Sequence, residues 1–225
     1  MNVAAVVVAA GSGLRLGRAT PKALVELAGR TILARSLAVF DRPDITELVV
    51  VAPGPAVDRL RAEHRVTVVA GGPSRSESVR RGLAAVSERS EWVLIHDAAR
   101  PLVPATVISN VIAELQAGAE AVIPVLPVAD TVKRIDGHGV VSETVDREML
   151  RRVQTPQGFR LDVLRAAYLA APEAVHTDDA GVVEAYGVAV RTVPGDEEAF
   201  KITTPYDLEL ATRLVQDPPA PGGQA

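Results

Sequence analysis

A glycine-rich segment near the start of the chain has the residue types best suited to chemistry. Residues 11–22 contain three glycines and three cations: Gly11, Gly13, Gly17, Arg15, Arg18 and Lys22. Glycine lets the backbone turn sharply and approach a ligand closely, so that backbone N–H groups can face an anion. The cations supply matching positive charge, although Arg18 fits an ordinary surface position equally well. The segment therefore predicts a phosphate-binding loop.

Two classes of nucleotide fit such a loop. A strand followed by spaced glycines also begins the dinucleotide-binding fold, and here the spacing is G-x-G-x-x-x-G. That fold needs an acidic residue at the end of its second strand to hold a ribose, whereas the strand predicted at residues 48–52 ends in Pro53-Gly54-Pro55. Three cations in one loop also suit a triphosphate. We therefore favour a nucleoside triphosphate over a dinucleotide.

A second turn and an aspartate belong to the same predicted crevice. Gly71-Gly72-Pro73 precedes a helix that Ser74 and Glu77 are predicted to open as a capping box, and Asp97 follows a buried strand at residues 91–96. Ligands of open α/β sheets bind beyond the carboxyl ends of the strands. The loop at Gly11, the second turn and Asp97 should therefore converge. The structural alternative for Asp97 is a helix or turn cap.

The elements that must position these residues alternate along the chain. The apolar run at residues 3–10 fits a strand buried on both faces at the centre of a parallel sheet. Further strands are predicted at residues 48–52, 66–70, 91–96, 121–126 and 188–193. Helices are predicted at residues 32–40, 55–64, 74–88, 104–117, 162–171 and 177–186, and from Thr204-Pro205 onward. This order predicts βαβ units with right-handed crossovers and helices on both faces of the sheet.

Residues 130–147 break this alternation. They form two β-rich runs around Asp136-Gly137-His138-Gly139, which indicates a hairpin with a short glycine loop. The runs alternate poorly and carry many charges, and a strand pair alone is marginally stable in water. We expect a protruding β-arm that packs against a second subunit in a homodimer.

Composition limits the classes of function. The chain has 225 residues, with 24 basic and 28 acidic residues and a formal net charge of −4, so no global field recruits nucleic acid or an anionic membrane. It has no cysteine, which excludes disulfides and thiolate chemistry, and its four histidines lie far apart, which argues against catalytic zinc. No basic leader and no apolar run of about 18 residues is present. We expect a cytoplasmic protein without membrane contact.

The chain length fits one α/β domain, predicted at residues 1–216. Residues 217–225 read DPPAPGGQA, and this Pro/Gly-rich composition predicts a disordered tail.

Several motifs in order resemble those of a known family. They are AAGSGLRLG at 9–17, PK at 21–22, GGPSRSESV at 71–79, HDAARP at 96–101, DTVKR at 130–134, TVDR at 144–147, TPQ at 155–157, TDD at 177–179 and KITTP at 201–205. Together they resemble the 2-C-methyl-D-erythritol 4-phosphate cytidylyltransferases of the non-mevalonate isoprenoid pathway, to about Leu214. The resemblance implies a Rossmann-like nucleotidyltransferase fold. It also implies cytidylyl transfer from CTP to methylerythritol phosphate, with Mg²⁺ and release of pyrophosphate.

The resemblance also implies roles for individual residues. The catalytic cations would be Arg15, Lys22 and Lys201. The nucleotide would bind Ala9, Ala10, Gly11, Gly13, Gly72, Ser78, Asp97 and Ala98. The acceptor would bind Arg100, Thr131, Lys133, Thr155 and Thr177, together with Arg147 of a neighbouring subunit. Asp97 would help to hold Mg²⁺. Pro73 and Leu14 depart from the family pattern, since some relatives carry a polar side chain and a basic residue there.

The chemistry of the acceptor agrees with the absence of a recognisable nucleophile motif. A phosphate monoester has a second pKa of about 6, so its oxygen can attack without a protein base. The protein must instead align two anions and neutralise the charge that develops on the phosphoryl groups. Transfer to another polyol phosphate, such as ribitol 5-phosphate, would need a similar nucleotide half. A non-catalytic nucleotide-binding regulator would be expected to lack Lys22 or Asp97, and both are present.

Overall fold

A computed structural model describes residues 2–11, 21–64, 66–170 and 176–217 of the chain. Four residues of the predicted phosphate loop, Gly13, Arg15, Gly17 and Arg18, lie outside the described residues, as does the tail from residue 218 onward. The last helix ends at Gln216, next to the predicted domain boundary.

The fold is built on β1 (Val3–Val8), which lies between two parallel neighbours. The eight-stranded sheet has the order β10-β7-β11-β6-β1-β4-β5, and β12 also pairs with β7. The other strands are β4 (Ile45–Ala52), β5 (Thr67–Ala70), β6 (Trp92–Asp97), β7 (Ala121–Pro127), β10 (Arg151–Val153), β11 (Gln157–Arg160) and β12 (Val190–Pro194). The prediction of a buried central first strand is confirmed, although the strand ends at Val8 and not at Ala10.

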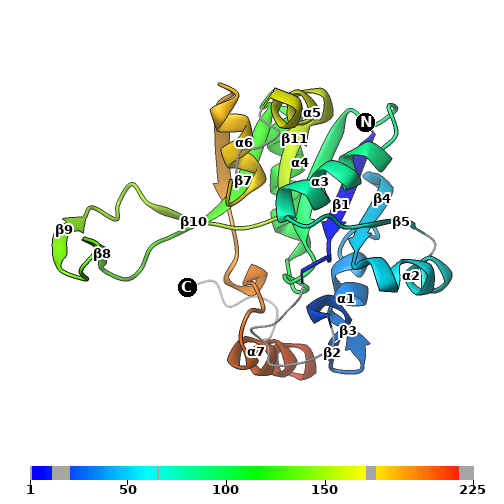
Figure 1. The fold of residues 1–225 in the computed structure, drawn as a ribbon, viewed down its shortest axis with the longest axis horizontal. Coiled ribbons are helices and arrows are strands. Elements are labelled where there is room, and N and C mark those ends of the chain that lie inside the picture. Colours follow the sequence, from blue (N-terminus) through cyan, green and yellow to red (C-terminus); the bar gives the residue numbers. More distant parts are fainter. Residues whose placement is uncertain (1, 12–20, 65, 171–175, 218–225) are drawn as a thin grey trace.

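Helices cover both faces of the sheet, as Figure 1 shows. They are α1 (Ile32–Ala38), α2 (Val57–Glu63), α3 (Arg75–Ala85), α4 (Ala105–Gln116), α5 (Leu161–Ala170), α6 (Asp179–Ala185) and α7 (Pro205–Gln216). Alternate residues of β1 enter two cores: Ala5 and Val7 lie in a core with α1, α2 and α4, whereas Ala4 and Val6 lie in a core with α3, α5 and α6. This two-sided burial explains why β1 is continuously apolar, and it confirms the predicted α/β fold class.

Two strands of the main sheet were not predicted. β10 pairs antiparallel with β7, and β11 lies between β6 and β7 and is antiparallel to both. Their sequences, RRV and QGFR, are too short and too polar to show a strand pattern. A small hairpin of β2 (Glu26–Leu27) and β3 (Arg30–Thr31) was also missed, with Ala28 and Gly29 at positive φ in its turn.

Most helix starts have the caps that their sequences suggest. The hydroxyl of Ser74 accepts from the Glu77 N–H at 3.1 Å, but Glu77 directs its carboxylate toward Arg80 and Arg81 instead of closing the box. The predicted capping box at α3 is therefore only half formed, and α3 ends at Ala85 instead of residue 88. A complete box opens α7, between Thr204 and Asp207. Short 3₁₀ segments are η2 (Lys22–Leu24), η3 (Gly54–Ala56) and η4 (Glu197–Ala199).

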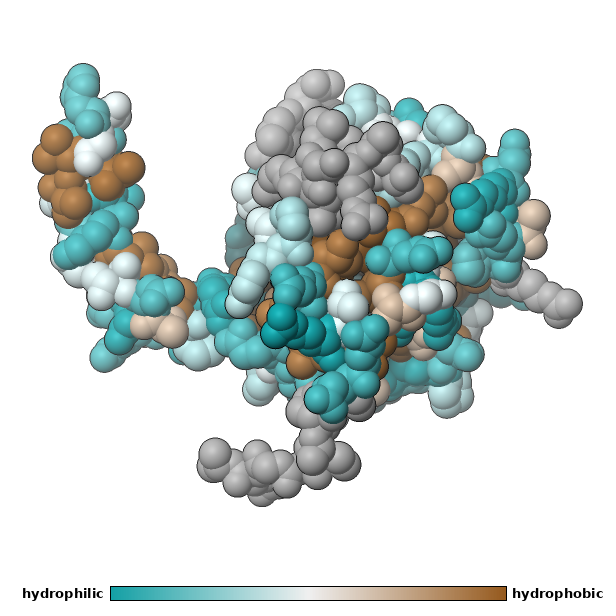
Figure 2. Space-filling view, turned by 90° about the horizontal axis from the view of Figure 1, so that it is seen from below, coloured by the Kyte–Doolittle hydropathy of each residue, from teal (hydrophilic) through white to brown (hydrophobic). Residues whose placement is uncertain are grey.

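The predicted hairpin projects from the body of the protein. β8 (Val132–Ile135) and β9 (Val141–Val145) form a separate antiparallel pair, which stands away from the main sheet in Figure 1. Apolar surface gathers along this arm in Figure 2, and Ile135, Val140 and Val141 are each more than half exposed. Exposed apolar side chains on a lone hairpin leave it without a hydrophobic core of its own.

None of the helices in the described ranges has the length and apolarity needed to cross a membrane.

The close contact between α3 and the sheet depends on Gly82. A Cβ at this position would lie 2.5 Å from Val6 Cγ1 and 2.9 Å from Val51 Cγ2, and both valines are fully buried. We expect Gly82→Ala to lower the free energy of unfolding by about 1–3 kcal/mol, because overpacking outweighs the better helix propensity of alanine. Urea denaturation would measure this. Gly54→Ala is the control, since nothing lies within 4 Å of its added Cβ, and equal midpoints for the two variants would contradict the prediction.

Candidate active site

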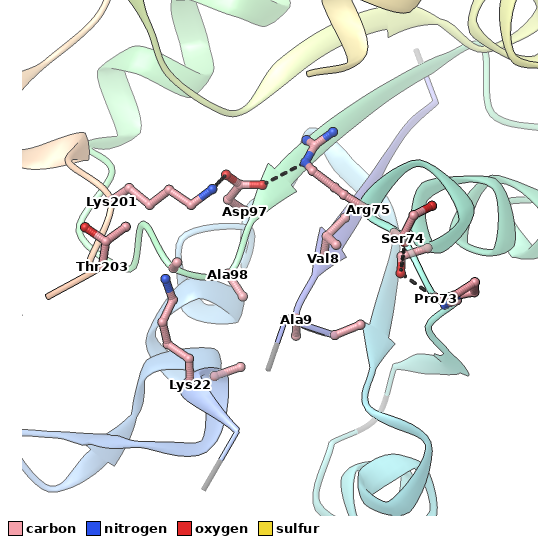
Figure 3. Close-up of a pocket in the computed structure, with 16 residues that line it drawn as sticks. Val8, Ala9, Lys22, Pro73, Ser74, Arg75, Asp97, Ala98, Lys201 and Thr203 are labelled. Carbon is pink, nitrogen blue, oxygen red and sulfur yellow. Dashed lines mark hydrogen bonds and ion pairs between the residues drawn. The ribbon is translucent and has the colours of Figure 1, made fainter. Parts of the chain in front are cut away.

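A cavity of about 590 Å³ opens where the loops after β1, β5 and β6 meet. Its volume is in the range usual for small-molecule sites. The predicted site residues that line it are Ala9, Ala10, Gly11, Lys22, Gly72, Ser78, Asp97, Ala98 and Lys201. Ser74, Arg75 and Thr203 line it as well (Figure 3). The cavity thus brings together the predicted nucleotide-binding residues that the described ranges contain.

Strand pairing explains why these loops converge. Val8 is in register with Asp97 across the β1–β6 pair, and the Ala98 N–H donates to the Val8 carbonyl at 3.1 Å. On the other side, the Ala9 N–H donates to Val51 O at 2.7 Å. Because these parallel strands end at the same level, the loops that follow them lie together at the carboxyl end of the sheet. This confirms the predicted crevice.

The second glycine turn packs closely against the first loop. The Gly72 N–H donates to the Ser78 hydroxyl at 3.1 Å, and this hydroxyl donates to the Ser74 carbonyl at 2.9 Å. A Cβ on Gly71 would lie 2.3 Å from the Ala10 Cβ, so only glycine permits this approach. Ser78 therefore shapes the turn as well as lining the cavity.

Asp97 is the charged centre of the cavity. Its Oδ2 accepts from Lys201 Nζ at 2.7 Å, and its Oδ1 faces Arg75 Nε at 3.4 Å. Burial raises the pKa of Asp97, but the two cations outweigh burial and hold the pKa well below its usual range. Both oxygens of an ionised carboxylate thus pair with cations, whereas the capping alternative requires hydrogen bonds from backbone N–H groups.

The cavity offers a limited set of metal ligands. The described residues contain no cluster of three or more His, Cys, Asp or Glu side chains that could hold a metal by itself. Asp97 nevertheless fits Mg²⁺, because this ion usually takes only one or two carboxylates from a protein and completes its shell with phosphate oxygens and water. A metal that arrives with a triphosphate suits this site better than one held by the protein alone.

Thr155 lies behind the cavity and does not line it. Its buried Oγ1 accepts from the Asp97 N–H at 3.1 Å and lies 3.1 Å from Nδ1 of His96. Nε2 of His96 lies 3.2 Å from Arg100 O, which can only accept, so in the neutral ring Nε2 carries the hydrogen and donates to this carbonyl. Nδ1 is then an acceptor, and the Thr155 hydroxyl donates to it. Burial lowers the pKa of His96 to about 4, so the ring is neutral near physiological pH. Thr155 thus fixes the backbone of Asp97.

Arg100 also faces inward. Its guanidinium donates to Ala199 O at 2.7 Å and to Val153 O at 3.4 Å, and so ties the turn after β6 to η4 and β10. Burial lowers the pKa of Arg100. Because the ordinary pKa of arginine is very high, the side chain nevertheless stays charged. Arg100 does not line the cavity in the part of the chain that the structure describes.

The remaining predicted acceptor residues lie on the arm or its base, or before α6. Lys133 donates to the Thr144 hydroxyl, and Arg147 donates to the Ala129 carbonyl. Thr131 and Thr177 are exposed, and none of these predicted residues lines the cavity. A single chain therefore assembles the predicted nucleotide site but does not bring the arm residues to it.

The sequence interpretation missed the ionic connection behind Asp97. Arg75 and Asp179 form an ion pair at 2.6 Å across 104 positions of sequence, and Asp179 is fully buried. Arg75 lies in the family motif GGPSRSESV and Asp179 in the family motif TDD. Charged residues in the first turn of a helix are usually solvated or act as caps, so only their presence in these motifs could have suggested a role in the site.

The comparisons with known proteins agree with this geometry. Residues 3–217 match the family described as IspD, 2-C-methyl-D-erythritol 4-phosphate cytidylyltransferase. The chain belongs to this family. Its curated relatives include the enzymes of that name from Rhodococcus opacus (strain B4), 51% identical over 96% of each chain, and from Saccharopolyspora erythraea, 50% identical over 96% of this chain and 100% of the relative. Among solved IspD-family structures, that of 2-C-methyl-D-erythritol 4-phosphate cytidylyltransferase from Thermus thermophilus has a TM-score of 0.81 at 38% identity, covering 96% of this chain and 100% of that one.

The inward hydrogen bonds of Thr155 predict a stability effect. We expect Thr155→Val to lower the free energy of unfolding by about 2 kcal/mol, since it leaves buried groups of His96 and Asp97 without a partner. Thr155→Ser keeps the hydroxyl and is the matched control, expected to lose less. Urea denaturation followed by circular dichroism would measure both, and a Thr155→Val variant as stable as wild type would rule out this pairing.

Proposed function

We propose that the chain transfers the cytidylyl group of CTP to 2-C-methyl-D-erythritol 4-phosphate, with release of pyrophosphate. Two observations support this function. The family match spans residues 3–217, and the cavity at the sheet edge combines a carboxylate, two lysines and close backbone turns. These are the groups expected of a site that aligns phosphates, and they include no activated nucleophile.

The proposed reaction needs no protein base. The acceptor phosphate is largely dianionic near neutral pH, so one of its oxygens can attack the α-phosphorus of CTP while pyrophosphate leaves. His96 is fully buried and neutral, and both of its ring nitrogens are engaged. It therefore supports Asp97 and does not transfer a proton in this reaction. The task of the chain is to orient two anions that repel each other.

Lysines from two separate segments supply positive charge to the cavity. Lys22 begins η2, and Lys201 lies in the segment before α7; Figure 3 shows both side chains reaching toward the same space. We assign Lys22 to the triphosphate and Lys201 to the reacting phosphates, where charge increases in the transition state. Arg15 is proposed to act on the same phosphates as Lys22, on the sequence resemblance alone.

Asp97 is the residue proposed to hold Mg²⁺ together with phosphate oxygens. When bound, the ion neutralises charge on the triphosphate and on the leaving pyrophosphate. The pairing of Asp97 with Lys201 and Arg75 keeps its carboxylate ionised, which a hard cation requires.

The nucleotide is proposed to bind through the two glycine turns. Backbone groups near Gly11, Gly72 and Ala98 border the cavity, and Ser78 fixes the second turn. Ala9 and Ala10 leave this space open because their side chains are small. Gly13 is proposed to bind the nucleotide on the sequence resemblance alone. Backbone groups in fixed positions can recognise a base edge through hydrogen bonds.

The acceptor is proposed to bind between two subunits. Thr131, Lys133 and Arg147 do not line the cavity of their own chain. They lie on the arm that projects from the body of the protein (Figure 1), and this arm exposes apolar side chains. We propose an isologous homodimer in which Arg147 reaches the acceptor in the partner's site. Arg100, Thr155 and Thr177 stay as proposed acceptor residues. Arg100 and Thr155 already form hydrogen bonds within the protein, so each would have to contact the acceptor in addition to these bonds. A cytoplasmic location is likewise proposed, on the sequence features described above.

A panel of acceptors tests the reaction. With CTP and Mg²⁺, we expect pyrophosphate release to be fastest with 2-C-methyl-D-erythritol 4-phosphate and much slower with ribitol 5-phosphate and other polyol phosphates. Faster release with ribitol 5-phosphate would favour the alternative cytidylyltransferase. No release with any acceptor would favour a nucleotide-binding regulator.

The same assay tests the role of Lys22. Lys22→Ala should lower turnover about a hundredfold, since a charge-assisted contact to the transition state is worth about 3 kcal/mol.

Subunit mixing tests the composite site. Lys22→Ala and Arg147→Ala chains, each with little activity alone, should form heterodimers that combine both defects in one site and leave the other intact. Random exchange makes about half of the dimers mixed, so about a quarter of wild-type activity should return. Mass spectrometry of differently labelled chains verifies exchange. If exchange occurs without recovery of activity, Arg147 does not act in the partner's site.

A further inference from the structure

Asp179 is a fully buried carboxylate at the start of α6. Its Oδ1 accepts from the Tyr168 hydroxyl at 2.6 Å, and its Oδ2 accepts from Arg75 Nη2 at 2.6 Å. Its backbone N–H donates to Gln157 Oε1 at 3.2 Å, so α5, β11 and α6 all help to hold it. The carboxylate is thus fixed in both position and orientation.

Arg75 connects this buried carboxylate to the cavity. One side of its guanidinium meets Asp179, and Nε faces Asp97 Oδ1 at 3.4 Å. Asp97 in turn pairs with Lys201. Figure 3 shows Arg75 and Lys201 reaching Asp97 from opposite sides. The four charges alternate in sign, so Asp179 adds the negative charge that lets two cations meet one cavity carboxylate.

Helix stability alone does not account for this arrangement. Arg75 is the first residue of α3, where a positive charge opposes the helix dipole. A buried ion pair also costs desolvation, and well-packed apolar residues of similar size often stabilise a protein as well or better. Helix stability therefore does not explain this pair, whereas a guanidinium held beside Asp97 does.

We propose that Asp179 is a positioning residue for the reaction: it holds Arg75 so that the guanidinium fixes the orientation in which Asp97 receives the divalent cation that accompanies CTP. Tyr168 completes the arrangement by holding Asp179. This inference rests on the proposed function, since it assigns Asp97 to the metal. Residues that orient a metal ligand commonly change metal affinity or activity by about 10–100-fold when they are replaced.

The test is Asp179→Asn, which keeps the shape of the side chain and an acceptor for Tyr168 but removes the charge that holds Arg75. Mn²⁺ binding in the presence of CTP, followed by electron paramagnetic resonance, should weaken about tenfold. CTP binding in EDTA should be unchanged, because the glycine turns are intact. Asp97→Asn shows the largest loss that the measurement can detect.

Arg165, on α5, provides a matched control, because it contacts the opposite, C-terminal end of α3. Its side chain is 26% exposed, as is that of Arg75, and it pairs with Glu88 at 2.6 Å while donating to Leu83 O and Val86 O. Arg165→Met should lower stability and leave Mn²⁺ affinity unchanged. A merely structural role of Asp179 would make its variant behave in the same way, and that result would overturn the proposal.

A double variant separates positioning from folding. Arg75→Met with Asp179→Leu removes both charges, so stability should recover relative to Asp179→Asn, whereas Mn²⁺ affinity should stay low. Recovery of both would overturn the proposal, as would wild-type affinity in Asp179→Asn. If Asp179→Asn does not fold, the double variant, which leaves neither charge of the pair without its partner, gives the Mn²⁺ readout. Because Mn²⁺ binding needs no acceptor, a wild-type protein that fails to release pyrophosphate would refute the proposed reaction without deciding this inference.

Discussion

The pairing of Asp97 with Lys201 and Arg75 is the interaction on which the site depends. It joins the end of β6, the first turn of α3 and the segment before α7, which are far apart in the sequence. Each of the three side chains would be costly to desolvate alone, and together they leave an ionised carboxylate at the cavity wall. The cavity therefore keeps its charge distribution only while the surrounding elements stay packed.

Polar contacts of the backbone and of buried side chains provide that packing. Thr155 and His96 fix the amide and the turn of Asp97 from behind, and Arg100 ties the same turn to the carbonyls of Ala199 and Val153. Residues that the family resemblance assigns to the acceptor thus also hold the strand end in place. A role in substrate binding and a role in positioning are compatible, because a carbonyl-bound arginine or a threonine hydroxyl can contact a ligand with its remaining hydrogen-bonding capacity.

Local signals predicted much of this structure. The apolar run of β1, the turn at Gly71-Gly72 and the place of Asp97 after a buried strand follow from patterns within a few residues, and the structure confirms the crevice they indicate. The polar strands β10 and β11 could not be predicted, because their own composition does not indicate a strand. They are strands because β10 pairs with β7 and β11 pairs with β6 and β7. The ion pair of Arg75 with Asp179 is equally non-local. No local pattern shows which buried charge will meet which.

The position of β11 also affects how the chain can acquire its structure during synthesis. One edge of β6 pairs with β1, which precedes it, but the other edge pairs with β11, which is made 60 residues after β6 ends, from Asp97 to Gln157. On the ribosome, the most buried part of the sheet therefore has an open, apolar edge until that late strand emerges. Such an edge can pair with other chains. The strand that ends in Asp97 therefore completes its pairing only after a further 60 residues have been made.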